Sequence, residues 1–217
     1  MMPAMDPDTA SHPSLTYLAL GDSYTIGEAV DSTSRWPVQL ARKLRGEGIP
    51  LADPRIVART GWTTDELAAG MDSVDLNPPY DMVSLLIGVN NQYRGRSLEE
   101  FRDQFAELLD RAVALAGGDP ERVLVLSIPD WGVMPFAEGR DREAIAEAID
   151  AFNEAVLRRT LAQGAHHVDV TAISREAATD TTLVAPDGLH PSGRQYARWV
   201  DEVLPAAVRV PYGTEEG

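Results

Sequence analysis

The stretch that decides the fold is Leu15-Thr16-Tyr17-Leu18-Ala19-Leu20-Gly21-Asp22-Ser23-Tyr24-Thr25. Residues 15–20 are mostly apolar and do not alternate cleanly with polar residues, which is typical of a strand covered on both faces in a parallel sheet. The Gly-Asp-Ser sequence that follows favours a tight turn. The stretch therefore predicts a buried strand that leads into a turn, with Ser23 at the carboxyl end of the strand.

The alternation of apolar runs with amphipathic segments continues along the chain. Further strands are predicted at 55–58, 81–88, 123–128 and 167–170. Helices are predicted at 34–45, 63–71, 97–116, 141–163 and from 192 onward, while the residues after 88 are predicted to form a loop. This order of elements indicates an α/β fold in which a parallel sheet lies between two layers of helices, with right-handed crossovers.

Several side chains indicate where the helices begin, end and face the core. Thr63 with Glu66, and Ser97 with Glu100, have the spacing of a capping box. Pro205 is expected to kink or end the last helix. The helix at 141–163 should end at Gly164, and its predicted apolar positions are Ile145, Ile149, Phe152, Val156 and Leu161.

Length and composition are those of an ordinary globular protein. The chain has 217 residues, of which 44% are hydrophobic and 24% are charged. We predict one folded domain at 15–210, with flexible tails at 1–14 and 211–217.

The charge and the missing cysteines exclude several kinds of chemistry. The net charge of −15 repels phosphate backbones, which argues against nucleic acid as a partner. Without cysteine there can be no disulfide, thiolate metal site or cysteine nucleophile. Residues 1–14 do not resemble a secretory signal, and no apolar run approaches the roughly 20 residues of a membrane span. We expect a cytoplasmic protein without stable membrane insertion.

Five separated segments are expected to meet at one edge of the sheet. In open α/β sheets, ligands bind beyond the carboxyl ends of the strands. The predicted strand ends bring together Ser23, Gly61, Asn90, Trp131 and the turn at 187–190. We therefore expect the active site at this edge.

These segments contain the groups that serine-based acyl transfer needs. A serine hydroxyl becomes a useful nucleophile when an imidazole takes its proton and a carboxylate fixes the imidazole tautomer. Ser23, His190 and Asp187 supply the three groups, and one compact turn can present the last two. A developing oxyanion also needs hydrogen-bond donors, for which the amides of Ser23 and Gly61 and the carboxamide of Asn90 are candidates.

Four blocks of sequence together resemble the SGNH hydrolases, also called GDSL-type esterases and lipases. In chain order the blocks are Gly21-Asp22-Ser23-Tyr24-Thr25-Ile26-Gly27, Gly61, Gly88-Val89-Asn90-Asn91 and Asp187-Gly188-Leu189-His190-Pro191. The resemblance extends from residue 15 to about residue 200. It implies a flavodoxin-like three-layer α/β/α sandwich with a five-stranded parallel sheet, and it implies no cofactor.

The resemblance also implies an activity and a role for each residue. The implied reaction is hydrolysis of a small-molecule carboxylic ester, with a short acyl chain or acetyl ester favoured, through an acyl-enzyme. Ser23 would be the nucleophile and would lend its amide to the oxyanion hole. Gly61 and Asn90 would be the other donors, and Asp187 with His190 would form the base.

Two positions depart from the pattern of this family. Tyr24 stands where the family's name expects leucine, at a position that varies among its members. Asn91 stands where aspartate is usual. Asparagine keeps the shape of aspartate but not its charge, so this departure bears on the loop that holds Asn90.

Aromatic and histidine residues near the strand ends have two interpretations each. Trp62, Tyr93 and Trp131 could wall a pocket for the acyl or alcohol group, although large aromatic residues usually pack in a core. The pair His166-His167 suggests a metal site, but neighbours on a strand point to opposite faces. We therefore expect no metal.

Other functions stay open on the sequence alone. Acyl transfer to an acceptor other than water, thioester cleavage and lysophospholipid cleavage would use the same three groups. A catalytically silent binding module would have no reason to keep all of them. A flavodoxin-like cofactor binder would need a phosphate-binding loop after the first strand, where Asp22 would repel phosphate.

Overall fold

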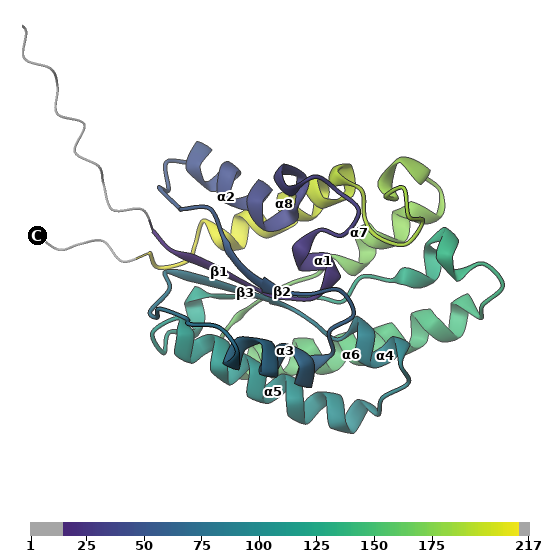
Figure 1. The fold of residues 1–217 in the computed structure, drawn as a ribbon, viewed down its shortest axis with the longest axis horizontal. Coiled ribbons are helices and arrows are strands. Elements are labelled where there is room, and N and C mark those ends of the chain that lie inside the picture. The colour runs from purple at the N-terminus through teal and green to yellow at the C-terminus, as the bar shows by residue number, and fades with distance from the viewer. Residues whose placement is uncertain (1–14, 213–217) are drawn as a thin grey trace, which may run out of the picture.

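The computed structural model describes residues 15–212, which contain a five-stranded parallel sheet between two layers of helices (Figure 1). The strands are β1 (Tyr17–Gly21), β2 (Arg55–Ala58), β3 (Met82–Leu86), β4 (Val123–Leu126) and β5 (His166–Val168). Their order across the sheet is β2-β1-β3-β4-β5, which is the flavodoxin-like order. The predicted three-layer α/β/α fold is confirmed.

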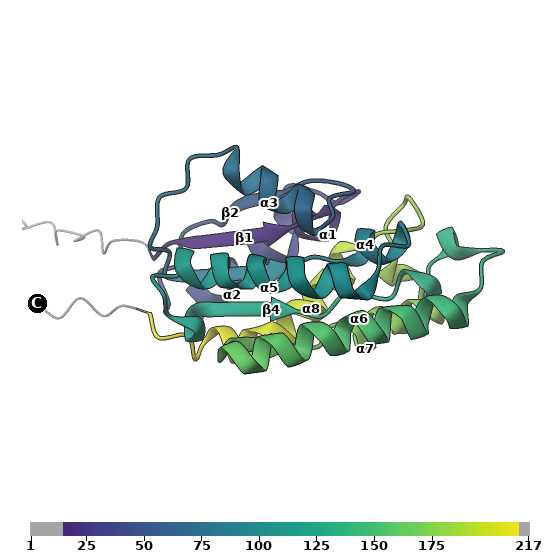
Figure 2. The same ribbon diagram turned by 90° about the horizontal axis from the view of Figure 1, so that it is seen from below.

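The central strands form the core of the molecule. Every residue of β1, β3 and β4 is buried, because helices cover both faces of the sheet, and this explains why the sequence of these strands does not alternate. Tyr17 lies beside Met82 and Gly21 beside Leu86, so β1 and β3 end level with each other. Figure 2 shows the strands running toward the same end of the molecule, where α1 and α4 follow them.

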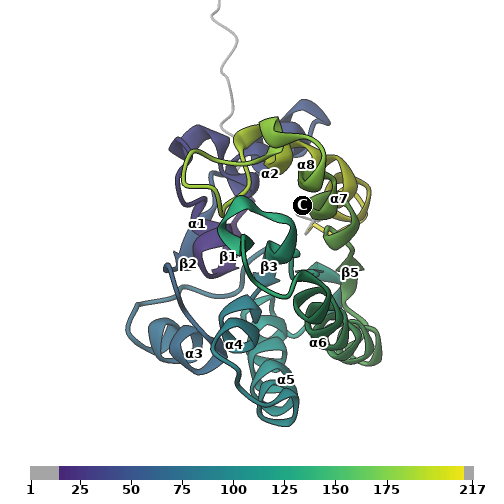
Figure 3. The same cartoon turned by 90° about the vertical axis from the view of Figure 1, so that its right-hand side faces the viewer.

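The helices form one layer on each face of the sheet (Figure 3). One layer contains α1 (Ser23–Ile26), α2 (Trp36–Gly46), α7 (Thr171–Arg175) and α8 (Gly193–Ala207), with α2 packed on α8. The other contains α3 (Thr64–Asp72), α4 (Val89–Tyr93), α5 (Leu98–Leu115) and α6 (Arg142–Gln163), with α5 packed on α3 and α6. Short 3-10 helices are η1 (Ser32–Ser34), η2 (Pro120–Arg122), η3 (Trp131–Val133), η4 (Pro135–Ala137), η5 (Glu176–Ala178) and η6 (Thr181–Leu183).

One of the two predicted capping boxes forms completely. The box between Thr63 and Glu66 is present at the start of α3, where the Thr63 amide donates to Glu66 Oε2 at 2.9 Å. At the start of α5, Ser97 Oγ accepts from the Glu100 amide at 3.1 Å. The Glu100 carboxylate accepts from Arg96 and Gln104 instead of from Ser97, so only half of the second box forms.

Three details of the helices differ from the predictions. The segment after β3 is not only a loop, because α4 begins at Val89; five residues are too few to show a helical period. Leu161 is 62% exposed, and Thr160 takes the buried position because its hydroxyl can donate to the Val156 carbonyl at 2.7 Å. Pro205 does not end α8, which continues to Ala207.

The ends of the chain lie mostly outside the described residues. The tail predicted at 1–14 and residues 213–217 of the tail predicted at 211–217 fall outside them. Tyr212 is described, and its hydroxyl donates to the Ala207 carbonyl at 2.9 Å. Within residues 15–212, no helix combines the length and the hydropathy needed to cross a bilayer.

Candidate active site

The turn after β1 places Ser23 at the carboxyl edge of the sheet. Asp22 caps α1, since its Oδ1 accepts from the Tyr24 amide at 3.0 Å, and Ser23 is the first residue of that short helix. Gly21 is required because a Cβ there would lie 2.5 Å from the Leu86 carbonyl oxygen of β3. The Gly-Asp-Ser sequence therefore serves to turn the chain in very little space.

The turn at 187–190 is closed by hydrogen bonds to one carboxylate. Asp187 Oδ1 accepts from the amides of Leu189 and His190, both at 3.0 Å. Gly188 has a φ of 72°, in the left-handed region that glycine adopts without strain. Asp187 Oδ2 lies 2.6 Å from His190 Nδ1, so the turn brings carboxylate and imidazole together by local contacts alone.

The structure brings the three predicted groups of the base and nucleophile into one chain of hydrogen bonds. His190 Nε2 lies 2.9 Å from Ser23 Oγ, although the two residues are 167 positions apart. Both side chains are almost completely buried, and the Tyr24 ring meets the imidazole edge to face with centroids 5.6 Å apart. In this arrangement Nε2 faces the hydroxyl and Nδ1 faces the carboxylate, as a general base requires.

Asp187 is held in its ionised form. Burial alone would raise its pKa, but the hydrogen bonds from the His190 ring and from the amides of His190 and Leu189 outweigh burial and leave the pKa below its usual value. A carboxylate at Nδ1 fixes the tautomer in which Nε2 can accept a proton. The turn at 187–190 therefore gives the His190 ring the orientation that a general base needs.

The backbone amides of Ser23 and Gly61 are the two candidate main-chain donors. Gly61 has a φ of 83° in the turn closed by the bond from the Trp62 amide to the Arg59 carbonyl at 3.2 Å, which is the φ expected at the third residue of a type II turn. Within residues 15–212, neither the Ser23 amide nor the Gly61 amide donates an intramolecular hydrogen bond. Both can therefore donate to a bound group.

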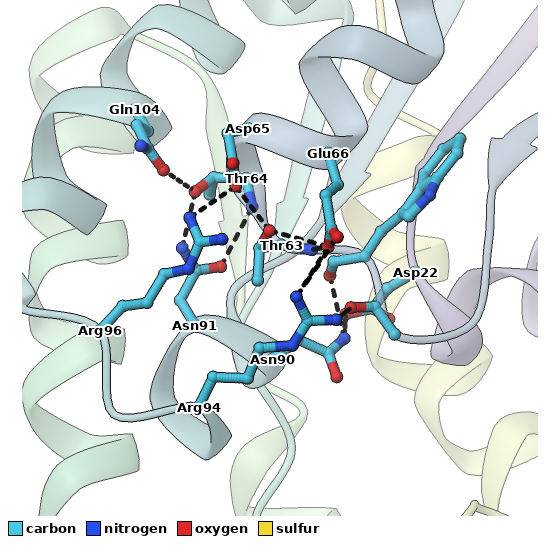
Figure 4. A network of polar contacts seen from close by, with 12 residues as sticks. Asp22, Thr63, Thr64, Asp65, Glu66, Asn90, Asn91, Arg94, Arg96 and Gln104 are labelled. Carbon is cyan, nitrogen blue, oxygen red and sulfur yellow. Dashed lines mark hydrogen bonds and ion pairs between the residues drawn. The ribbon is translucent and has the colours of Figure 1, made fainter.

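Asn90 is placed by the sharp start of α4. Gly88 has a φ of 127°, and a Cβ there would lie 2.6 Å from the Phe101 ring. Asn90 Nδ2 donates to the Trp62 carbonyl at 2.9 Å and makes a longer contact of 3.4 Å with Asp22 Oδ2 (Figure 4). The carboxamide thus lies between the loop that carries Gly61 and the residue that precedes Ser23.

Asp22 is an acidic group that the sequence did not single out for this site. It is completely buried, and burial raises its pKa to about 7 although the hydrogen bonds from the Tyr24 amide and Asn90 act in the opposite direction. Its charge therefore changes within the physiological range of pH. Asp22 touches both the start of α1 and Asn90, so it couples the candidate nucleophile to a candidate donor.

Asn91, which stands where the family usually has aspartate, makes two hydrogen bonds with Thr64. Its Oδ1 accepts from the Thr64 amide at 3.1 Å, and its Nδ2 donates to Thr64 Oγ1 at 2.7 Å. The Thr64 hydroxyl in turn donates to Gln104 Oε1. An ionised aspartate can only accept, so the hydrogen bond from Nδ2 is a feature of the asparagine.

An apolar cavity of about 130 Å³ opens beside Ser23 and His190. Its lining residues are Ser23, Tyr24, Val89, Asn90, Tyr93, Trp131, Phe136, Leu189 and His190. Tyr93 and Trp131 lie where the sequence predicted them. Trp62 does not line the cavity. Its indole packs so closely on Gly70 of α3 that a Cβ on Gly70 would lie 2.1 Å from the ring. Phe136 was missed, because it lies in η4 and belongs to no periodic pattern.

Three aromatic rings form one wall of the cavity, and the Arg140 side chain lies against them. The rings of Tyr93, Trp131 and Phe136 pack against one another with centroids 5.3 to 6.3 Å apart. The guanidinium of Arg140 lies 5.3 Å from each of the three centroids. Trp131 Nε1 donates to Gln92 Oε1 at 2.8 Å, so this wall is held in place on the side of α4 as well.

Comparisons with known proteins bear on the family and the fold. The model of the GDSL-like Lipase/Acylhydrolase family matches residues 19–198. A comparison with curated proteins gives no match.

Solved structures share the fold at low sequence identity. The esterase EstA from Pseudoalteromonas sp., inhibited by monoethylphosphonate, is 16% identical with a TM-score of 0.69, over 89% of this chain and 97% of that one. The lipase/acylhydrolase from Enterococcus faecalis is 17% identical with a TM-score of 0.70, over 92% and 99%. The lipase Lip_vut3 from a goat rumen metagenome is 20% identical with a TM-score of 0.70, over 92% and 99%.

Proposed function

The chain belongs to the GDSL-like lipase/acylhydrolase family, and we propose that it cleaves carboxylic esters through an acyl-enzyme on Ser23. The observation that carries this proposal is the chain of hydrogen bonds from Ser23 Oγ to His190 Nε2, at 2.9 Å, and from His190 Nδ1 to Asp187, at 2.6 Å. Ser23 and His190 also line an apolar cavity, which is the environment that an acyl group prefers.

Acylation follows from the positions of these groups. His190 Nε2 accepts the proton of Ser23 Oγ as the oxygen attacks the carbonyl carbon, and Asp187 stabilises the imidazolium that forms. The carbonyl oxygen becomes negatively charged and accepts hydrogen bonds from the Ser23 and Gly61 amides. When the tetrahedral intermediate breaks down, His190 gives its proton to the leaving alcohol, and the acyl group stays on Ser23.

Deacylation uses the same groups with water as the nucleophile. His190 accepts a proton from water as it attacks the acyl carbon, and the proton then returns to Ser23 Oγ when the acid leaves. We assign the third donor of the oxyanion to Asn90, through the hydrogen of Nδ2 that now makes the long 3.4 Å contact with Asp22. The shorter bond to the Trp62 carbonyl keeps the carboxamide oriented meanwhile.

Covalent labelling tests the proposed nucleophile directly. A fluorophosphonate should label the protein at one serine, identified by peptide fragmentation as Ser23, because the phosphonyl oxygen occupies the position of the oxyanion. EstA from Pseudoalteromonas sp., which shares the fold, is inhibited by a phosphonate. His190→Ala should lose the labelling, since the hydroxyl then lacks its base. Labelling of a different serine, or unchanged labelling in His190→Ala, would contradict the proposed function.

The size of the cavity predicts short acyl groups. A cavity of about 150 Å³ holds one benzene molecule, so the 130 Å³ beside Ser23 suits acyl chains of a few carbons. Rates on p-nitrophenyl esters should be highest for acetyl to butanoyl and should fall about tenfold or more by octanoyl, since a poorly placed methylene group costs about 1–3 kcal/mol. Steady-state kinetics across the ester series measure this preference.

Removal of one ring from the wall should relax the chain-length limit. Phe136 lines the cavity and is 42% exposed, so Phe136→Ala opens the cavity to solvent with little loss of core packing. We expect the ratio of octanoyl to acetyl rates to rise about tenfold. Leu161→Ala is the matched control, because Leu161 is an exposed apolar residue of α6 that does not line the cavity. An unchanged ratio in Phe136→Ala would place the acyl chain elsewhere.

A further inference from the structure

Four consecutive residues are each held by a side chain: three in the loop before α3, and Thr64, which begins α3 (Figure 4). The hydrogen bonds are Arg94 Nη2 to the Gly61 carbonyl at 2.6 Å, Asn90 Nδ2 to the Trp62 carbonyl at 2.9 Å, the Thr63 amide to Glu66 Oε2 at 2.9 Å, and the Thr64 amide to Asn91 Oδ1 at 3.1 Å. Three of these side chains come from α4 and the residue that ends it. The loop that carries one candidate oxyanion donor is thus fastened to the helix that carries another.

Arg94 makes two contacts with this loop at once. One arm of its guanidinium donates to the Gly61 carbonyl, and the other lies 3.1 and 3.3 Å from the carboxylate oxygens of Glu66. Glu66 in turn accepts from the Thr63 amide. A single planar group therefore fixes both ends of the segment 61–63, which the rigid fork of a guanidinium suits and the single charge of a lysine does not.

The energy of the ion pair does not by itself explain this arrangement. The Arg94 and Glu66 side chains are 41% and 39% exposed, and pairs as exposed as this contribute little to stability. Gly61, in contrast, is the residue type with the greatest backbone freedom, and its amide has no acceptor within residues 15–212. Its orientation depends on what holds the peptide groups around it.

We propose that Arg94 is a positioning residue that keeps the Gly61 amide aligned with the Asn90 carboxamide for the developing oxyanion. The inference rests on the proposed function of the site. Donors of this kind act because they are aligned before charge develops, within about 0.5 Å of the productive geometry. Arg94 lies three residues beyond the third of the four blocks that resemble the SGNH hydrolases.

Kinetics of Arg94→Met and Arg94→Lys test the proposal. The loss of an oxyanion donor costs about 100- to 1000-fold in kcat, and a misaligned donor should cost less, so we expect Arg94→Met to lower kcat about 10- to 100-fold and to change KM less than about threefold. Arg94→Lys should recover only part of kcat. Arg96→Met is the matched control, because Arg96 pairs with Asp65 and Glu100 but reaches no carbonyl of the loop; its kcat should stay close to that of the parent.

Chemical rescue separates positioning from a general structural role. Millimolar guanidinium or methylguanidinium added to Arg94→Ala should restore kcat several-fold, whereas sodium chloride at the same ionic strength should not, because only a guanidinium can bridge Gly61 and Glu66. Circular dichroism confirms that the variant is folded. Absence of rescue in the folded variant, an unchanged kcat in Arg94→Met, or an equal loss in Arg96→Met would overturn the proposal.

The same assays distinguish a failure of this inference from a failure of the proposed function. If the parent protein neither hydrolyses esters nor accepts a fluorophosphonate on Ser23, the proposed function is wrong and the inference falls with it. If the parent does both and Arg94→Met matches it in kcat, only the role of Arg94 is wrong.

Discussion

Ser23→Ala should lower kcat/KM for p-nitrophenyl acetate by about four orders of magnitude or more, because the loss of a triad nucleophile leaves only the donors and the binding site to accelerate the reaction. The hydroxyl lies 2.9 Å from His190 Nε2 and is almost completely buried. Alanine removes one oxygen and keeps the backbone amide, so the variant should fold as the parent does. The measurement is steady-state hydrolysis, with circular dichroism to confirm the fold.

The proposed mechanism also predicts that the losses of activity caused by substitution of Ser23 and of His190 will not be additive. Nucleophile and base act as one unit, so the double variant Ser23→Ala/His190→Ala should be no more than a few-fold slower than either single variant. His167→Gln is a matched control for the histidine, since His167 lies on β5 and does not line the cavity. If the two losses multiply instead, or if His167→Gln is as inactive as His190→Ala, the chain Ser23–His190–Asp187 does not perform the reaction.

The parts of this site that the sequence predicted are those set by short-range geometry. The turn at 187–190 closes on the carboxylate of Asp187 itself, and the turn after β1 needs Gly21 because β3 passes so close. The parallel order of the strands places the turn after β1 at the carboxyl edge of the sheet. The pairing of Asp187 with His190 is therefore local, whereas the contact of His190 with Ser23, 167 positions away, depends on the fold.

The parts that escaped prediction depend on contacts between distant segments. Arg94 belongs to none of the four blocks, and its relation to Gly61 appears only because α4 places it one helical turn after Asn90, as the residue that ends the helix. The sequence left Trp62 open between a pocket wall and the core, and its indole packs on Gly70 of α3. At Thr160, a hydroxyl that bonds to its own helix replaced an apolar residue on the buried face.

Asp22 should make the protein less stable as the pH rises from about 4 to about 8. Burial raises its pKa from the usual 3.8 to about 7, so between these values the folded state holds a proton that the unfolded state has released. The stabilisation is complete below the unfolded pKa and is lost as the pH rises through the folded pKa. A difference of about three pH units corresponds to about 4 kcal/mol in the free energy of unfolding.

The loss of stability that Asp22 is expected to cause at neutral pH is consistent with a role of this residue in the site. It caps α1 through the Tyr24 amide and faces Asn90 Nδ2, so one carboxylate orders the residues on both sides of the proposed oxyanion position. A group that destabilises the fold at neutral pH but orders a reactive site is an instance of the trade-off between stability and activity. Asp22→Asn should therefore lower kcat, because its amide would face the amide of Asn90 donor to donor.

Denaturant unfolding of Asp22→Asn and the parent at pH 4, 6 and 8 provides the test of this pH dependence. Asparagine does not titrate, so the stability of the variant relative to the parent should increase by about 4 kcal/mol between the lowest and highest pH. Asp187 has the opposite dependence, since its lowered pKa contributes stability that is lost as the pH falls; because it is present in both proteins, its effect cancels in the difference. A difference that stays constant from pH 4 to 8 would show that Asp22 keeps its ordinary pKa in the folded state, and the coupling to Asn90 would then have to involve a permanently charged carboxylate.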